Sequence, residues 1–260
     1  MTKLDHAVAV ITGASSGIGR AVALALARRG VMVALGARRM PELQAVVREI
    51  EEAGGRALAV ETDVEDAAHL HDLVEKARSE WGRLDIVVAN AGQYVRAAAE
   101  DVTMADIERS IEVNFYGSTR LVLAALPHLL EQRSGHIVLI ASVDGKKGLP
   151  LDTPYASAKF ALVGFGDVMR QELRRFGIGV STILPGRVDT PFVEPYLFPF
   201  ISRPIPPERV ASAVISALRR NRAEVVVPRF NILLVWAAAL VPRLADRAVR
   251  LLRLEGWRKP

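Results

Sequence analysis

Two residues near the middle of the 260-residue chain have types and a spacing suited to proton transfer: Tyr155 and Lys159, in the stretch YASAK. On an α-helix this spacing puts the phenol and the ammonium group one turn apart on the same face. A free tyrosine has a pKa of about 10, and a nearby positive charge lowers it because it favours the phenolate. The alternative is a surface pair, or a buried tyrosine whose lysine extends into solvent.

A glycine-rich stretch near the N-terminus, TGASSGIG, has the composition of a phosphate-binding loop. It joins an apolar run at 7–13 to a helical pattern at 18–30, where Gly30 is expected to cap the helix. Its glycines, spaced G-x-x-x-G-x-G, would let the backbone approach a pyrophosphate at the helix N-terminus. The expected cofactor contacts in this loop are Gly13, Ser15, Ser16, Gly17, Ile18 and Gly19.

The stretch LGARRM, at the end of the second apolar run, bears on which dinucleotide would bind. An acidic residue at this point hydrogen-bonds the ribose 2′-hydroxyl of NAD, whereas an arginine suits the 2′-phosphate of NADP. The chain has no acidic residue here and has Arg38 and Arg39. We therefore expect NADP(H) in preference to NAD(H). The alternative is that both arginines are solvated surface charges.

Two more motifs follow the third and fourth apolar runs. Asp63, in ETDV, has a carboxylate that could accept a hydrogen bond from an adenine amino group. Asn90 and the backbone of NAG would pass close to the adenine ribose. The expected contacts in these motifs are Asp63, Val64, Asn90, Ala91 and Gly92.

Six apolar runs alternate with helical patterns, and they lie at 7–13, 31–36, 56–64, 84–92, 135–142 and 179–186. Strands that are apolar throughout and separated by helices indicate a parallel sheet covered on both faces. The fold class expected is α/β, with a doubly wound parallel sheet of Rossmann-like form in a single domain with a C-terminal helical extension. Ligands of such sheets bind outside the carboxyl ends of the strands, where the motifs fall.

Composition and charge exclude other classes of protein. The chain has no cysteine, so disulfides, thiolate chemistry and cysteine metal sites are excluded, and no metal is expected. No secretory leader is recognised, and a cytoplasmic setting is expected, with or without membrane association. The net charge is +5, but residues 219–260 hold ten Arg or Lys against three acidic residues. A nucleic-acid binder usually carries its basic patch within the folded domain, so no nucleic-acid partner is expected.

These motifs and their order resemble the short-chain dehydrogenase/reductase family. The resemblance covers about residues 5–228 and rests on TGASSGIG, TDV, NAG, VNFYG, Ser142 in LIASV, YASAK and PGRVDT. One departure is ANAG, because the family usually has N-N-A-G and Ala89 replaces a structural amide. The resemblance implies an oxidoreductase that transfers a hydride between a nicotinamide and a ketone or secondary alcohol.

The resemblance also implies four catalytic residues. Tyr155 would be the acid in carbonyl reduction and the base in alcohol oxidation, and Lys159 would lower the pKa of Tyr155 and hold the nicotinamide ribose. Ser142 would stabilise charge on the substrate oxygen, although a serine at a strand end can also be a turn cap. Asn114 would hold a water that links Lys159 to solvent. The expected contacts with the nicotinamide end are Tyr155, Lys159, Pro185, Gly186, Val188 and Thr190.

The segment 191–209 is expected to cover the substrate, as it does in the family. It has six prolines and four aromatic residues, so regular structure is not expected to run through it. Its apolar character favours a lipophilic substrate, such as a steroid, a retinoid, an acyl chain or an aromatic carbonyl compound. The alternative is that these aromatic residues pack on the domain itself.

We divide the chain into a catalytic domain, 1–228, and a C-terminal extension, 229–260. Within the extension, residues 230–241 are apolar but too few to span a bilayer. They precede a helical pattern whose basic side is expected to carry Arg243, Arg247, Arg250 and Arg253. A basic amphipathic helix suits an anionic membrane surface. It could equally cover the substrate site or pack on a partner subunit.

The two long helical patterns around Asn114 and YASAK are apolar on more than one face, whereas a helix on a sheet needs one apolar face. In the family these helices pair across a two-fold axis, so a homodimer or homotetramer is expected. Candidate contact residues are Phe160, Val163 and Met169. Two alternatives to an enzyme are a catalytically idle dinucleotide-binding sensor or scaffold, and a membrane-surface protein that acts through the tail. The complete set of four catalytic residues favours the enzyme.

Overall fold

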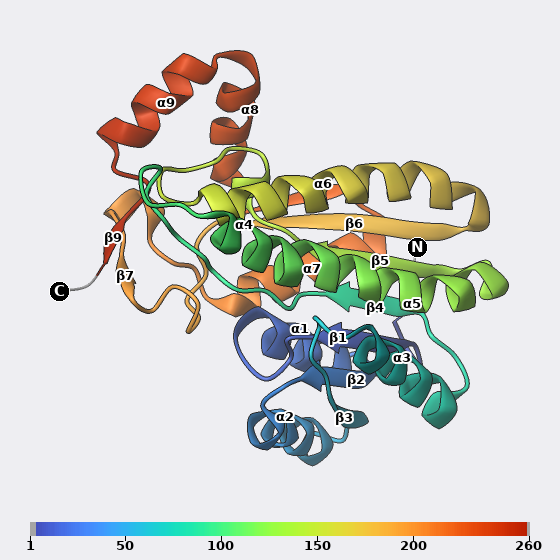
Figure 1. Cartoon of the computed structure of the whole chain (residues 1–260). Helices are drawn as coiled ribbons and strands as arrows, with labels where there is room; N and C mark the ends of the chain where they lie inside the picture. The colour runs from blue at the N-terminus through green and yellow to red at the C-terminus, as the bar shows by residue number, and fades with distance from the viewer. Residues whose placement is uncertain (1–3, 259–260) are drawn as a thin grey trace.

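The computed structural model describes residues 4–258, so 1–3 and 259–260, at the ends of the two predicted domains, lie outside the described residues. At its centre is a parallel seven-stranded sheet in the order β3-β2-β1-β4-β5-β6-β8, with helices on both faces (Figure 1). The doubly wound α/β prediction is confirmed, in a single domain with helices at the C-terminus.

The strands of the sheet are β1 (Val8–Thr12), β2 (Met32–Ala37), β3 (Ala57–Glu61), β4 (Ile86–Ala89), β5 (Gly135–Ile140), β6 (Ile178–Pro185) and β8 (Glu224–Val227). The α-helices are α1 (Gly17–Ala27), α2 (Met40–Glu52), α3 (Ala67–Trp81), α4 (Met104–Ile111), α5 (Gly117–Gln132), α6 (Thr153–Leu173), α7 (Pro207–Arg220), α8 (Ile232–Leu240) and α9 (Pro242–Leu251). The first six strands overlap the six predicted runs. The prediction missed β8, because this four-residue strand lies at the sheet edge and its apolar run is only three valines long.

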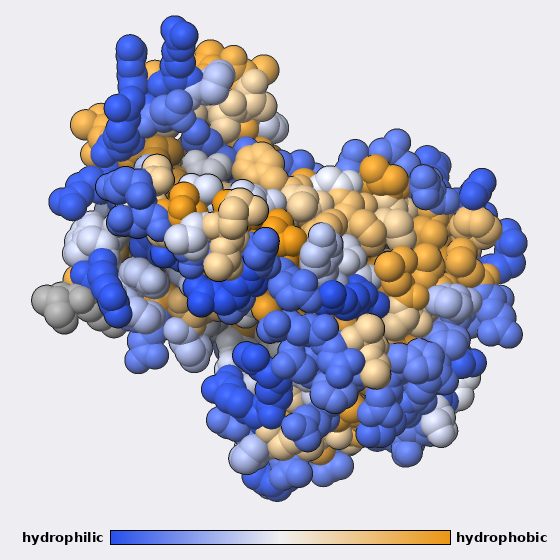
Figure 2. Space-filling model, viewed as in Figure 1, coloured by the Kyte–Doolittle hydropathy of each residue, from blue (hydrophilic) through white to orange (hydrophobic). Residues whose placement is uncertain are grey.

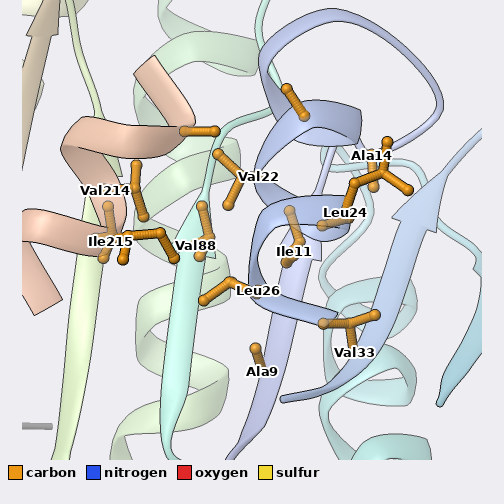
Figure 3. Close-up of a cluster of buried hydrophobic side chains, with 14 of the residues drawn as sticks. Ala9, Ile11, Ala14, Val22, Leu24, Leu26, Val33, Val88, Val214 and Ile215 are labelled. Carbon is orange, nitrogen blue, oxygen red and sulfur yellow. The ribbon is translucent and has the colours of Figure 1, made fainter. Parts of the chain in front are cut away.

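Two hydrophobic cores, one on each face of the sheet, hold the layers together. Helices α1, α2 and α7 cover one face, and α3, α5 and α6 cover the other. Figure 3 shows the first core, where Val22 and Leu26 of α1 lie between the sheet residue Ile11 and the α7 residue Val214. Fully burying such a side chain contributes about 1.5–3 kcal/mol. This packing fixes the strand ends that form the site.

Two helix ends differ from the prediction. Helix α1 ends at Ala27 with a cap at Arg28, so Gly30 does not cap the helix and instead takes a positive φ of 78° in the turn before β2. Arg253 lies beyond the end of α9, where its guanidinium stacks on the Trp257 ring at 4.9 Å. Only three of the four predicted arginines are therefore on that helix.

The C-terminal extension forms a helical hairpin, α8 and α9, that stands away from the sheet (Figure 1). Beyond it, the short strand β9 (Trp257–Arg258) pairs antiparallel with β7 (Tyr196–Leu197) of the segment 191–209. The end of the described chain is thus attached to the segment expected to cover the substrate. Among the described residues, no helix has the length and apolar character needed to cross a membrane.

Candidate active site

The carboxyl ends of the first six strands surround a cavity of about 730 Å³. The predicted site residues in its wall are Gly13, Ser15, Ser16, Gly17, Ile18, Arg38, Arg39, Asp63, Val64, Asn90, Ala91, Gly92, Ser142, Tyr155, Lys159, Pro185, Gly186, Val188 and Thr190. Two predicted site residues, Gly19 and Asn114, are not in the wall. The structure therefore brings nearly all predicted site residues to one cavity.

The glycine-rich loop after β1 is held in a tight conformation. Gly13 and Gly17 have positive φ values of 66° and 54°, which only glycine adopts readily. Gly19 approaches the loop backbone so closely that a Cβ would lie 2.3 Å from the Gly13 oxygen. The Asn90 amide Nδ2 donates to the oxygens of Thr12 (2.9 Å) and Gly13 (3.3 Å), which fixes the loop to the NAG motif. The result is an open cradle of backbone at the N-terminus of α1.

Two guanidinium groups stand at one end of this cradle. Arg39 donates from Nη2 to the hydroxyls of Ser16 (2.9 Å) and Ser15 (3.2 Å) in the loop. Arg38 Nη1 lies 3.9 Å from a carboxylate oxygen of Asp63, so part of its charge is already compensated. Arginine at the end of β2 can bind a phosphate ester on the adenosine ribose. The charge of Arg39 is compensated to a similar degree, because its Nη1 lies 3.8 Å from a carboxylate oxygen of Glu42. What distinguishes Arg39 is that its Nη2 faces the hydroxyls of the loop.

At the other end of the cavity, helix α6 presents Tyr155 and Lys159, both buried. Lys159 Nζ lies 5.6 Å from the centre of the Tyr155 ring and donates to the Ile140 oxygen at 3.0 Å. Ser142 follows β5, and the interaction of its hydroxyl with the Tyr155 phenol lowers the pKa of Tyr155, which partly offsets the effect of burial. The Ser142 hydroxyl also accepts from the Asp144 amide at 3.1 Å, so the predicted alternative of a turn cap is also met.

Asn114 lies behind the cavity wall, in a π-helical segment (Glu112–Tyr116) between α4 and α5. Such segments within α-helices are frequent at functional sites. The Asn114 amide donates to Gln93 O (2.9 Å) and Ser110 O (3.0 Å), and its Oδ1 accepts from Gln93 N (3.2 Å). It thereby ties the helix to the chain that follows NAG. Its expected role in holding a water stays a prediction.

Comparison with known proteins decides the family. Residues 7–197 match the family described as short chain dehydrogenase. The chain is a short-chain dehydrogenase/reductase. Ketoacyl reductase HetN of Nostoc sp. is 32% identical to it over 263 residues, which cover 96% of this chain and 90% of the relative. Uncharacterized oxidoreductase YxnA of Bacillus subtilis is 35% identical over 257 residues, covering 95% and 72%.

Solved structures agree with this assignment. A variant of actinorhodin polyketide ketoreductase, solved with NADPH, superposes with a TM-score of 0.80 at 29% identity and covers 87% of this chain and 97% of its own. A short chain dehydrogenase/reductase of Burkholderia phymatum, in complex with NAD, gives 0.86 at 25% identity, covering 94% and 96%. This short-chain dehydrogenase is therefore a hydride-transfer oxidoreductase that uses a nicotinamide cofactor.

The surroundings of Tyr155 and Lys159 shift the pKa of both side chains. Burial raises the pKa of Tyr155 above that of a free tyrosine, and the nearby Asp144 raises it further. Burial also lowers the pKa of Lys159 to about 8, so its ammonium group is still mostly charged at neutral pH. With its raised pKa, Tyr155 keeps its proton at neutral pH, which is the state needed to donate one.

Sequence reasoning missed a buried polar cluster at the substrate end of this dehydrogenase. Asp152, just before α6, accepts from Arg96 Nε at 2.7 Å and from the Tyr94 hydroxyl at 2.9 Å. Asp144 and Arg187 also line the cavity. In the sequence, Asp144 and Arg187 were marked only by their closeness to predicted motifs. Asp144 follows Ser142 by two residues, and Arg187 lies within PGRVDT. The aromatic rings around Tyr155 were missed as well, with Tyr94 at 5.0 Å between ring centres.

Proposed function

We propose that the protein is an NADP(H)-dependent reductase of lipophilic ketones, running the reverse oxidation of secondary alcohols under other conditions. One observation carries the proposal: Tyr155, Ser142 and Lys159 line one end of a cavity whose other end has Arg39 beside a phosphate cradle. The residues suit a dinucleotide that reaches along the strand ends. Family membership supports the hydride-transfer chemistry.

Each part of the site has a role in this mechanism. The loop backbone and Arg39 would bind the phosphates, and Lys159 would bind the nicotinamide ribose, which leaves the cofactor to supply a hydride. Ser142 would orient the carbonyl oxygen by donating a hydrogen bond to it. Tyr155 would then donate its proton to that oxygen as charge develops, a step that typically contributes about 10²- to 10⁴-fold in rate.

Support for NADP over NAD comes from this chain's own residues. The end of β2 has no carboxylate to accept from a ribose 2′-hydroxyl, and Arg39 is already hydrogen-bonded to the loop serines that flank the cradle. The solved neighbours include one complex with NADPH and one with NAD, so they favour neither.

The substrate end of the cavity favours an apolar compound. Phe192 and Ile201 come from the segment 191–209, and Leu233 and Leu252 come from the C-terminal hairpin. The Phe192 ring lies 6.0 Å from that of Tyr155, so an apolar wall approaches the reacting group. In this proposal the segment 191–209 and the C-terminal tail both cover a lipophilic substrate, as the sequence led us to expect of the segment and as one of the alternatives for the tail.

The deciding experiment is a substrate panel. Aliphatic, aromatic and alicyclic ketones, a β-keto thioester and a retinoid aldehyde would be mixed with NADPH or NADH, and cofactor oxidation followed by absorbance. We expect turnover of apolar ketones with a higher kcat/KM for NADPH. Tight NADPH binding without turnover of any compound would favour the idle sensor instead.

The proposed assembly is a homodimer formed through α6 and α5. An exposed stripe on α6 consists of Phe160, Gly164 and Val168, and a Cβ on Gly164 would meet no atom within 4 Å. A glycine inside an exposed helix costs about 0.5–1 kcal/mol, and close approach of a second helix gives a reason for it. Figure 2 shows apolar side chains gathered over α6 and α5. Val163, expected at this interface, is instead buried inside the subunit beside Gly145.

We also propose a peripheral membrane contact through the hairpin of α8 and α9. On α8, Trp236 and Leu240 form an exposed apolar stripe that continues to Leu233, which is exposed and also borders the cavity. On α9 the residues Arg243 and Arg247 are exposed. Figure 2 shows apolar and charged side chains next to each other at the outer end of the hairpin. Apolar insertion combined with basic charge is the chemistry of binding to an anionic bilayer surface, such as the cytoplasmic leaflet. Because this hairpin also lines the cavity, the contact would place the substrate entrance near lipid.

A further inference from the structure

Two segments far apart in the chain form a roof over the substrate end of the cavity: the segment 191–209 and residues 252–258. Ser202 of the first and Leu254 of the second line the cavity. The two segments pair with each other through β7 and β9. Gly256 has a positive φ of 67°, and a Cβ on it would clash with the aromatic ring that follows β7. The two parts of the roof therefore pack closely against each other.

One guanidinium group contacts both parts of the roof. Arg187 follows β6 and lies in the wall of the cavity. Its Nη1 donates to the Ser202 hydroxyl at 2.7 Å, and its Nη2 donates to the Leu254 oxygen. Its guanidinium carbon lies 4.1 Å from the centre of the Phe198 ring. Arg187 thus attaches both parts of the roof to the end of a central strand.

A second arginine holds the next residue of the C-terminal segment. Arg96, which follows β4, donates from Nη2 to the Glu255 oxygen at 2.8 Å. Its Nε donates to Asp152 at 2.7 Å, and this ion pair is almost fully buried. Two consecutive carbonyl oxygens, those of Leu254 and Glu255, are therefore held from two different loops. The C-terminal segment bridges the loops that follow β4 and β6.

The donors of Arg187 serve the roof and not an acidic partner. Among the residues that the structure describes, no ion pair joins Arg187 to a carboxylate. Within the same described chain, Arg187 Nε is buried without a hydrogen-bond partner, and so is Glu255 Oε2. A buried polar atom without a partner costs free energy, so the closed roof is held by less than its full set of contacts. Such a roof can open to admit a substrate and then close again.

We propose that Arg187 is a positioning residue that holds both parts of the roof closed over the apolar end of the substrate, and so gives the enzyme its preference for long apolar ketones. This inference rests on the proposed function. The planar guanidinium presents its donors in fixed directions, so it can hold Ser202 and Leu254 at the same time. With the roof closed, the apolar chain of the substrate is removed from water, and each buried methylene adds to its affinity.

The test compares wild type and Arg187→Met on methyl ketones from 2-butanone to 2-nonanone, with saturating NADPH. In wild type, KM should fall as the ketone lengthens, because the roof buries the added methylenes. In the variant, KM for 2-nonanone should rise about 10-fold, the value of one or two buried methylenes, and KM for 2-butanone less than about twofold. The change in kcat should be smaller than the change in KM. NADPH affinity, measured by fluorescence titration, should be kept, which shows that the variant is folded.

Arg187→Lys separates the clamping role from a role of charge alone. Burial raises the pKa values of Asp144 and Asp152, and the charge of Arg187 opposes this rise. A lysine keeps that charge but lacks the fork that holds two acceptors, so its KM for 2-nonanone should stay close to that of Arg187→Met. If Arg187 merely balanced the two carboxylates, the lysine variant would restore the wild-type KM, and short and long ketones would be affected alike.

Limited proteolysis gives a second readout that needs no substrate. Trypsin should cut after the exposed Arg253 about 10-fold faster in Arg187→Met than in wild type, because residues 254–255 are then less firmly held. Mass spectrometry of the C-terminal fragment measures the rate. The matched control is Arg175→Met, since Arg175 is exposed and also stacks on an aromatic ring, that of Phe176 at 4.8 Å, and it should change neither KM nor the rate of cutting.

The outcomes distinguish the clamp from the proposed function. An active enzyme in which Arg187→Met is cut at the wild-type rate, or shows the same change in KM along the whole ketone series, overturns the clamp alone. A wild-type protein that reduces no ketone overturns the proposed function and the role in substrate preference, whereas the trypsin rates still decide whether Arg187 holds the roof.

Discussion

At the scale of single residues, the proposed chemistry depends on one phenol that burial keeps protonated. Replacing Tyr155 by Phe removes that proton but keeps the ring, which packs at 5.0 Å from Tyr94 and 6.0 Å from Phe192. We expect kcat to fall by about 10²- to 10⁴-fold while NADPH affinity, measured by fluorescence titration, changes little. A variant that kept more than a tenth of the wild-type kcat would contradict the acid role.

We expect cofactor choice also to depend on single residues, chiefly on Arg39, whose guanidinium faces Ser15 and Ser16. Arg39→Ala removes the guanidinium beside Ser15 and Ser16, so kcat/KM for NADPH should fall about 10- to 100-fold, the value of one charged hydrogen-bonding group. The value for NADH should stay nearly constant. Arg48→Ala is the control, since it removes an exposed arginine from α2. Equal losses with both cofactors would argue against a phosphate contact.

The sequence allowed most of the site to be predicted because family motifs mark it. Ser142, Tyr155 and Lys159 were recognisable from LIASV and YASAK, and the structure brings them to one cavity. Asp144 was not recognisable, because an aspartate near a strand end is usually a solvated turn residue. What sets it apart is its burial beside Asp152, and that depends on how α6 packs over the turn. A pKa that is set by tertiary packing has no local sequence signal.

At the scale of elements, the apolar runs predicted the sheet because each central strand is buried on both faces. Strand β1, for example, is buried at all five positions, from Val8 to Thr12. Strand β8 was not predicted because it lies at the sheet edge, where it pairs with one strand only, and because it begins with the exposed Glu224. The end of α1 was misplaced since Gly30 and Arg28 are both compatible with a helix terminus. The existence of β8 and the end of α1 both depend on contacts between residues far apart in the chain, which a local sequence pattern does not contain.

Strand β5 carries a buried histidine that should make the stability of the sheet pH-dependent. Burial lowers the pKa of His136 to about 4, and its ring nitrogen Nε2 lies 2.8 Å from the Ser181 hydroxyl on β6. In the unfolded chain the histidine binds a proton near pH 6.5, so the unfolded state takes up more protons than the folded state between about pH 6.5 and 4. His136 therefore contributes stability above about pH 6.5, which is lost as the pH falls towards 4.

The measurement is urea unfolding of wild type and His136→Gln at neutral pH and at moderately acidic pH. The wild type should lose more stability on acidification than the variant, by up to roughly 3 kcal/mol over the full interval. Since both proteins keep the same carboxylates, the comparison isolates the histidine. Parallel losses in the two proteins would show that the imidazole does not resist protonation.

At the scale of the whole molecule, the exposed stripe on α6 should set the oligomeric state. Phe160→Glu places a charge where the second helix would pack, and the side chain is 47% exposed in the subunit, so folding should be preserved. Light scattering at micromolar concentration should give a dimer or tetramer for wild type and a smaller species for the variant. Phe200→Glu is the control, because Phe200 is exposed in the segment 191–209. A monomeric wild-type protein would rule out this interface.

The C-terminal hairpin joins the remaining two features of the molecule, its basic tail and its apolar cavity. Trp236 is 58% exposed on the α8 stripe, so its fluorescence should shift to the blue when the hairpin enters lipid. We expect this shift, and co-sedimentation, with phosphatidylglycerol vesicles and much less with pure phosphatidylcholine, because exposed arginines accompany the stripe. Added salt should weaken the binding, since each basic residue near the surface contributes about 1 kcal/mol through a screened interaction.

Trp236→Ser should lower the affinity while turnover of a water-soluble ketone persists, and Arg247→Gln should reduce only the preference for anionic lipid. Equal binding to both vesicles, or none to either, would leave the hairpin as a cover for the substrate or a contact for a partner subunit.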